Sequence, residues 1–360
     1  MSTFLQLHIL TAYPAANLNR DDTGRPKTLM FGGQERLRVS SQSLKRAIRT
    51  SDVFANALTG ALGSRSNSFA DSLVKALRNR EMAEDEIKKR VGAVIEKDRL
   101  GKLKKDKPTD TEQLVHLAPE ELVRLDALAD RLVEGSELAE KEALVLVANP
   151  RAADIALFGR MLADNPVYNV EAAAQVEHAL TTHRVSVEDD YYTAVDDLKA
   201  ANREADRGAG FIGVQEYGAG IFYLYLCVDA SLLVRNLPGD NKALAAAAVE
   251  ALVDAACTVS PKGKQNSYAS RAYASFALAE MGSRTPRSLA AAFLNPVGAG
   301  NGENDHGAAS IERLRVLRAK IDHAYGPCWT KDAVMDVFGG NGSLSELKAL
   351  AREAVHAAAA

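Results

Sequence analysis

The sequence predicts an α+β fold in which a long helical segment is inserted near the start of the chain. Residues 3–11 alternate closely enough between two sets of side chains to predict a first strand. Residues 38–51 contain a short helix, and residues 57–150 are rich in Ala, Leu, Glu, Lys and Arg at helical spacing. The order strand, helix, strand, strand, helix, strand fits a modified ferredoxin-like or RNA-recognition-motif core.

The remaining elements follow from the pattern of apolar residues. A polar loop occupies residues 17–34, and Gly and Asn make residues 295–307 a predicted flexible loop. The other predicted elements are strands at 153–162 and 218–234, a helix at 241–257, a strand at 268–280, and helices near 308–324 and 343–357.

Composition favours a protein that folds in a reducing compartment. The chain has 360 residues, of which 47% are hydrophobic, and a net charge of −3. Its three cysteines are far apart, which indicates neither a disulfide framework nor a thiolate metal site. No apolar run reaches the roughly 20 residues that span a bilayer, and the first residues are typical of a strand, not of a signal peptide. We therefore expect a cytoplasmic protein with no membrane partner.

The stretch RVSSQSLKRAIRTS, residues 38–51, predicts a helix with one cationic face. Leu44, Ala47 and Ile48 fall on the opposite, apolar face at a helical period. Ser40 and Ser41 stand at the N-cap position. The residues expected on the cationic face are Gln42, Lys45, Arg46 and Arg49. A helix N-terminus beside hydroxyl groups and cations is a ready anion site.

The charge around this helix is concentrated. Residues 20–49 contain eight basic and three acidic residues, a net charge of +5, so the rest of the chain carries −8. A basic patch on an acidic chain indicates a defined track for a polyanion. The alternative interpretation is a solvated basic surface helix.

A second basic stretch lies in the predicted helical insertion. Residues 87–107 hold nine basic and three acidic residues. This pattern is typical of a solvated segment, and it also fits a second nucleic-acid contact. The residues that would make such a contact with DNA are Lys88, Lys89, Lys102, Lys104 and Lys105.

Three other patterns carry weaker hypotheses. GAGFIG at 208–213 matches a dinucleotide-binding motif, but strand-like residues follow it, so we favour a hairpin. His178 and His183 are five apart, which is off the spacing that puts two ligands on one helix face, so we interpret them as structural. The acidic doublets that could hold Mg²⁺ for phosphodiester cleavage are Asp21–Asp22, Asp189–Asp190 and Asp196–Asp197.

Several segments together resemble one known family. They are LNRDD, GRPK, FGGQERLRVSSQSLKRAIRTS, DIALFGRM, HALTTH, YYTAVDDL and GVQEYGAGIFY. The chain is similar to the CasC backbone subunits of the type I-E CRISPR surveillance complex, Cascade. The likeness is weakest between residues 60 and 145 and after residue 285.

The resemblance implies an architecture and a set of contacts. The expected domains are a first part of an RRM-like palm at 1–56, helical fingers at 57–150, more palm at 151–190, a protruding thumb hairpin at 191–219, and the completion of the palm with C-terminal helices at 220–360. The guide-RNA contacts carried over from the family are Arg20, Lys27, Ser40, Gln42, Lys45, Arg46, Arg49 and Met161, with Tyr191 and Tyr192 beside a displaced base. Ser41 joins them from the helix geometry. Packing is the alternative for the tyrosines, with Tyr191 in the core and Tyr192 exposed.

The function implied is non-enzymatic. Copies of the subunit would stack head-to-tail along a guide RNA (crRNA), with other Cascade subunits, and target DNA would pair with the guide; no cofactor is expected. One rival hypothesis is a metal-dependent RNA endonuclease that uses Asp21 or Asp22, although both aspartates could instead hold Arg20 in place. A second rival is a free-standing protein that binds single strands.

Overall fold

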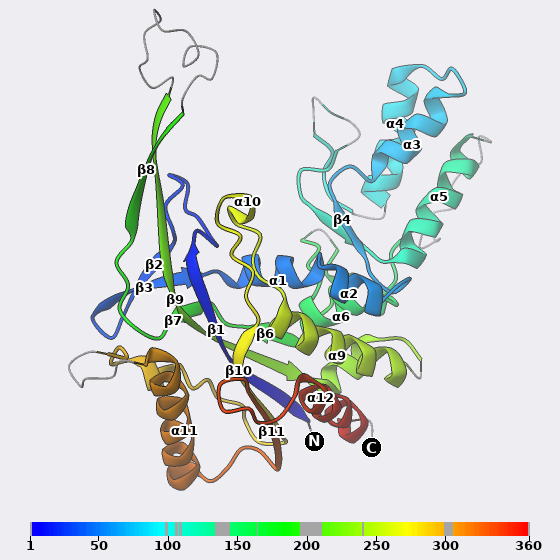
Figure 1. Cartoon of the computed structure of the whole chain (residues 1–360). Coiled ribbons are helices and arrows are strands. Elements are labelled where there is room, and N and C mark those ends of the chain that lie inside the picture. The colour runs from blue at the N-terminus through cyan, green and yellow to red at the C-terminus, as the bar shows by residue number, and fades with distance from the viewer. Residues whose placement is uncertain are drawn as a thin grey trace, which may run out of the picture.

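A nine-stranded sheet forms the centre of the computed structural model, which describes residues 2–97, 100–104, 107, 110–133, 145–163, 165–194, 211–239, 241–298 and 305–358 (Figure 1). The strands of this sheet are β1 (Phe4–Ala16), β2 (Thr28–Phe31), β3 (Gln34–Val39), β6 (Ala174–Val176), β7 (Ala179–Thr181), β8 (Glu188–Ala194), β9 (Phe211–Asp229), β10 (Ala274–Gly282) and β11 (Lys331–Asp336). Strands β4 (Ser64–Ser66) and β5 (Val115–Leu117) form a separate pair.

Helices lie mainly on one side of this sheet. They are α1 (Ser41–Arg49), α2 (Asp52–Ala57), α3 (Ala70–Arg78), α4 (Glu84–Lys97), α5 (Pro119–Val133), α6 (Ala153–Phe158), α8 (Ala230–Asn236), α9 (Lys242–Thr258), α10 (Gln265–Tyr268), α11 (His306–Tyr325) and α12 (Leu344–Ala358), with 3₁₀ turns at Pro166–Tyr168 and Ala290–Phe293. Within the described residues, no helix is both long enough and apolar enough to cross a membrane.

The strand order is β11-β10-β1-β9-β7-β3-β2, and neighbouring strands pair antiparallel. Strand β9 is the longest, because its second half pairs with β1 while its first half pairs with β8. The mixed α+β class expected from the sequence is confirmed.

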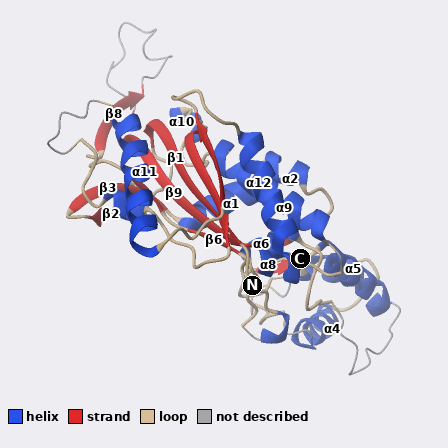
Figure 2. Cartoon of the chain, turned by 90° about the horizontal axis from the view of Figure 1, so that it is seen from below, coloured by secondary structure: helices blue, strands red, loops and turns tan. Residues whose placement is uncertain are grey.

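The two faces of β1 show why the sheet is covered on both sides. Leu5, Leu7 and Ile9 point into one core, which includes residues of α9 and α12. Leu10 points to the other side, into a core that includes Ile311 of α11. This alternation is what a strand with two buried faces requires, and Figure 2 shows α11 on the other side of the sheet from α9 and α12.

A second, separate apolar core belongs to α3, α4 and α5. Leu73, Val91 and Leu125 are buried in it, one from each helix. These helices stand apart from the sheet in Figure 1. A cluster with its own core is the expected form of an inserted helical domain, while the boundaries of 57–150 stay a prediction.

Four predicted elements differ from the structure. Residues 153–158 form helix α6 and not a strand. All of Ala153–Leu157 is buried, so this short run has no polar face to reveal a helical period. The polar loop at 17–34 contains β2 and the start of β3, joined at Gly32 and Gly33, whose φ angles of 59° and 74° suit a tight hairpin turn.

The other two differences concern where strands begin and end. Strand β9 stops at Asp229, whose carboxylate accepts the Leu232 N–H at 2.8 Å and caps α8, so the strand predicted at 218–234 ends early. The strand predicted at 268–280 starts only at Ala274, because α10 and a turn precede it. Residues 211–213 of GAGFIG open strand β9 and no helix, and residues 208–210 lie outside the described residues.

Candidate nucleic-acid interface

Helix α1 begins as the sequence predicts, with Ser40 as its N-cap. The Ser40 Oγ accepts the Ser43 N–H at 3.3 Å, and the Ser40 N–H donates to the Asn19 side chain at 2.8 Å. Ser40 is buried, so what the structure shows is a cap that fixes the start of the helix. Its predicted RNA contact stays a prediction.

The amide of Ser41 has a partner that the sequence did not indicate. It donates to Nδ1 of His178 at 3.4 Å, and Nη1 of Arg38 lies 3.1 Å from the same nitrogen. Burial, with the positive charges of Arg38 and Lys27, lowers the pKa of His178. Of the first three amides of α1, the Gln42 N–H alone has no acceptor among the described residues. The start of α1 therefore offers one free N–H to an outside acceptor.

The face of α1 expected to be cationic divides in two. Gln42 and Arg46 are exposed, and partial burial lowers the pKa of Lys45. Arg49 is only 18% exposed, and its Nη1 lies 3.7 Å from a carboxylate oxygen of Asp154 in α6. Arg49 thus ties α1 to α6, which reduces its availability to an outside ligand.

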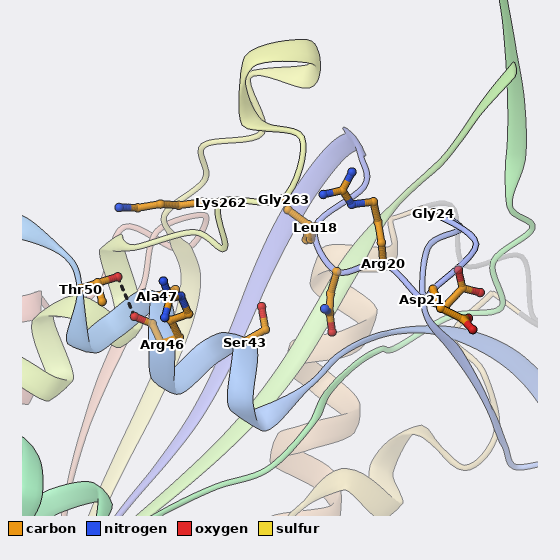
Figure 3. Close-up of a pocket in the computed structure, with 12 residues that line it drawn as sticks. Leu18, Arg20, Asp21, Gly24, Ser43, Arg46, Ala47, Thr50, Lys262 and Gly263 are labelled. Atoms are coloured by element: carbon orange, nitrogen blue, oxygen red, sulfur yellow. Dashed lines mark hydrogen bonds between the residues drawn. The ribbon is translucent and has the colours of Figure 1, made fainter. Parts of the chain in front are cut away.

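A groove of about 540 Å³ runs beside α1 (Figure 3). Ser43, Arg46 and Thr50 line it from the helix. Arg20 and Lys262 lie on the other side, from two different loops. Asp21 and Asp22 also line the groove, and Asp21 is engaged in a turn of its own loop. The three cations share one opening, a geometry suited to a phosphate backbone.

The loop that supplies Arg20 is held by a turn. Oδ1 of Asp21 accepts the Thr23 N–H at 2.9 Å, the Thr23 hydroxyl at 2.8 Å and the Arg25 N–H at 2.9 Å. These bonds, that of the Thr23 hydroxyl foremost, lower the pKa of Asp21. Within the described residues Arg20 has no ion pair, so the idea that the aspartates hold Arg20 by charge is wrong.

The basic patch at 20–49 is smaller on the surface than in the sequence. Arg36 is fully buried and donates to the backbone oxygens of Thr181 and Phe293. Arg25 is paired with Glu216 at 2.6 Å. Among the described residues 20–49, the basic side chains that are neither buried nor paired with another side chain are Arg20, Lys27, Lys45 and Arg46.

Met161 and Tyr191 occupy exposed positions, while Tyr192 is half-buried. Met161 is 80% exposed, and it follows Arg160, whose guanidinium is buried against Glu121 at 2.7 Å. Tyr191 is 63% exposed on β8, so the alternative that places it in the core is wrong. The Tyr192 ring lies 6.1 Å from that of Phe211. Strand β8 and the first part of β9 project from the body (Figure 1).

The Lys-rich stretch lies on the helical insertion. Lys88 and Lys89 are exposed on α4, and Lys102 is exposed in the loop that follows. Lys104 lies 3.5 Å from Asp110, and Lys105 is outside the described residues. Asp196–Asp197 and residues 195–210 of the predicted thumb are also outside them. No cluster of three or more His, Cys, Asp or Glu side chains that could hold a metal occurs in the described part of the chain.

Sequence reasoning missed Arg38, His178 and Lys262. His178 was considered only as a partner of His183, whereas the ring of His183 lies 4.8 Å from that of His306, tilted by 39°. The pairing of Arg38 with Leu180, between β3 and β7, brings His178 to α1 across more than 130 residues. No local pattern carries that information.

Comparison with known proteins defines the class. The chain belongs to the family of Cas proteins described as "CT1975-like protein", which matches residues 5–356. A solved chain described as "CRISPR RNA-guided surveillance complex, pre-nicking" is 29% identical with a TM-score of 0.80 and covers 99% of this chain and 100% of its own. Another, described as "CRISPR RNA-guided surveillance complex", is 24% identical with a TM-score of 0.68, covers 98% and 99%, and shows the same fold. No curated protein matches.

The resemblance drawn from the sequence motifs, to a Cas backbone-type protein, is therefore confirmed. The type I-E assignment stays a prediction.

Proposed function

We propose that this chain is a non-catalytic backbone subunit of a type I-E Cascade complex, and that it holds the guide RNA through the groove beside α1. The observation that carries this proposal is the groove itself, which Arg20, Arg46 and Lys262 border and which runs along α1 from Ser43 to Thr50. Membership of the family supports it, as does the 29%-identical chain, which comes from an RNA-guided complex.

The chemistry of the groove favours phosphate and ribose over bases. Arg46 supplies charge inside the groove. On the adjacent face of α1, Lys45 adds a second cation, and the exposed amide of Gln42 can both donate to and accept from a 2′-hydroxyl. Contacts of this kind carry no sequence information. A subunit that must hold any guide needs this property, since it leaves the bases free to pair with target DNA.

The topology supports the finer architecture that we propose. The central order β10-β1-β9-β7 is the 4-1-3-2 order of a ferredoxin-like palm, with α3, α4 and α5 as fingers and the β8–β9 hairpin as the base of a thumb. Copies would stack head-to-tail, because a heterologous interface that does not close produces a helical filament. Other Cascade subunits would limit its length, and we expect assembly in the cytoplasm.

The test is co-purification with the neighbouring operon products, followed by extraction and sizing of bound nucleic acid. The unchanged chain would be compared with Lys45→Ala/Arg46→Ala and with Lys320→Ala, which removes an exposed cation from α11. We expect one RNA of uniform length with the first and third proteins and its loss with the double variant. RNA of mixed lengths without defined subunit ratios would favour the free-standing single-strand binder.

The nuclease hypothesis is tested on the same material. Asp21 is engaged in its turn, so Asp22, which is exposed, is the carboxylate to change. We expect no Mg²⁺-dependent cleavage of RNA or DNA by the complex. Cleavage that disappears in Asp22→Ala and persists in Asp85→Ala, on the surface of α4, would replace our proposal with the nuclease.

A further inference from the structure

A second and larger groove adjoins the first. It has a volume of about 1190 Å³ and lies between the start of α2 and residues 258–273. Arg20 and Lys262 line both grooves. A linear polyanion that leaves the side of α1 could therefore enter the second groove without losing contact with cations.

The charge of the second groove is strongly unbalanced. Its cations are Arg20, Lys262, Lys264 and Arg271, and Asp52 is the acidic residue in its lining. None of these four cations forms an ion pair within the described residues. Unpaired cations gathered around an open groove attract a polyanion, since their mutual repulsion is relieved when it binds.

Residues 258–273, which carry three of these cations (Lys262, Lys264 and Arg271), are held in place at both ends. The Ser260 hydroxyl joins the two ends of this segment, because it accepts the Ala272 N–H at 3.0 Å and donates to the Ala272 carbonyl oxygen at 3.2 Å. Gly263 packs closely on the loop that follows β1, so that a Cβ at this position would overlap the carbonyl oxygens of Leu18 and Asn17. Residues 258–273 thus form one wall of the second groove, and their fixed conformation lowers the entropy cost of binding.

The backbone of this wall adopts an uncommon conformation. Lys264 and Ala269, on either side of α10, both have φ of +48°, in the left-handed region that non-glycine residues seldom occupy. Such residues gather at binding sites, where the surrounding structure enforces them.

Two side chains of the wall are suited to a nucleotide. Tyr273 is 74% exposed, so its ring face is open to stacking. Gln265 lines the groove, and its Nε2 is buried without a hydrogen-bond partner among the described residues. A buried amide donor without a partner is rare in proteins and marks a position where a ligand or water oxygen completes the bonding.

We propose that residues 258–273 form the second wall of the nucleic-acid track, in which Lys262 and Arg271 contact phosphates and Tyr273 stacks on an unpaired base. The combination of a cationic groove and an open aromatic ring is the common design of single-strand sites. This inference rests on the proposed function and names guide RNA as the strand; displaced or target DNA is the other source of the same chemistry.

The test is fluorescence anisotropy of the full chain with a labelled single-stranded RNA of mixed sequence, at several salt concentrations. Lys262→Ala/Arg271→Ala should make the slope of log K against log[salt] shallower by about 1.4, because each single-strand phosphate contact contributes about 0.7. Tyr273→Ala should weaken binding by roughly 5- to 150-fold with the slope unchanged, and Tyr273→Phe should restore it. Lys320→Ala is the matched control.

The outcomes separate this inference from the function on which it rests. If Lys45→Ala/Arg46→Ala weakens RNA binding while the 258–273 variants do not, the second wall is wrong and the guide-binding proposal stands. If the unchanged chain binds no RNA, both fail. If the 258–273 variants keep RNA but their guide-loaded complexes lose capture of target DNA, the wall holds DNA, and our assignment of the strand is overturned.

Discussion

Nδ1 of His178 lies 3.1 Å from Nη1 of Arg38 and 3.4 Å from the amide nitrogen of Ser41. Arginine and a backbone N–H can only donate, so Nδ1 accepts and the imidazole proton sits on Nε2. One neutral histidine thereby joins β3, the β6–β7 turn and the first residue of α1. It fixes the helix start from which the proposed RNA contacts extend.

The first prediction concerns the pH dependence of this histidine. The folded pKa of His178 is lowered, so its contribution to stability is complete above the unfolded pKa of about 6.5 and is lost as the pH falls below it. His178→Ala should lower the free energy of unfolding by about 0.5–1.5 kcal/mol at pH 8. The difference between the two proteins should shrink toward pH 5, as measured by urea unfolding. Because His8 and His183 are present in both, their titration cancels. A difference that stays constant or grows would contradict the assignment.

The second prediction separates two arginines on one helix. Arg49→Ala removes one partner of the buried Asp154, which keeps its contacts with His116 and the Gly63 N–H, so it should lower the free energy of unfolding by about 1 kcal/mol. Arg46→Ala removes an exposed charge and should change that energy by less than about 0.5 kcal/mol. RNA binding should show the reverse order at a temperature where both variants are folded. Equal stability of the two variants would show that Arg49 is not anchored.

The third prediction compares two glycines. Gly263→Ala places a methyl group against the backbone of Leu18, which cannot move aside easily, and should cost about 1–3 kcal/mol of stability. Gly92→Ala, in the interior of α4 with open space around it, should stabilise by up to about 1 kcal/mol. Chemical unfolding monitored by circular dichroism measures both. A neutral Gly263→Ala would show that the loop does not pack as closely as described.

The fourth prediction addresses two lysines on helix α4. If Lys88 and Lys89 contact target DNA, Lys88→Glu/Lys89→Glu should weaken DNA capture by the complex and leave guide RNA retention unchanged. Lys320→Glu is the control for added negative charge, and gel-shift titration with extraction of the RNA gives both readouts. Loss of RNA in the Lys88→Glu/Lys89→Glu variant would mean that the guide runs on a different face.

Helix α1 shows what a sequence can predict. Its cap, its length and its buried face are local features, set by Ser40 and by the spacing of Leu44, Ala47 and Ile48, and the structure has all of them. The α+β class also follows from local patterns. The roles that the resemblance implies for Met161 and Tyr191 stay predictions.

What the sequence could not predict depends on contacts between distant segments. Arg49 has the same local context as Arg46, and only the position of α6 makes it a structural residue. The helical state of 153–158 was hidden because tertiary burial removed its polar face. No local feature distinguishes Lys262 from other loop lysines. It lies beside α1 because β1 and β10 pair, which brings the loop before β10 close to the loop after β1.

The most direct test of the central claim is the salt dependence of RNA affinity for the unchanged chain and for Lys45→Ala/Arg46→Ala, with two RNAs of unrelated sequence. The account predicts equal affinity for the two sequences and a slope about 1.4 shallower in the double variant, since two phosphate contacts are lost. An unchanged slope, or strong preference for one sequence, would contradict a groove that holds the backbone of any guide.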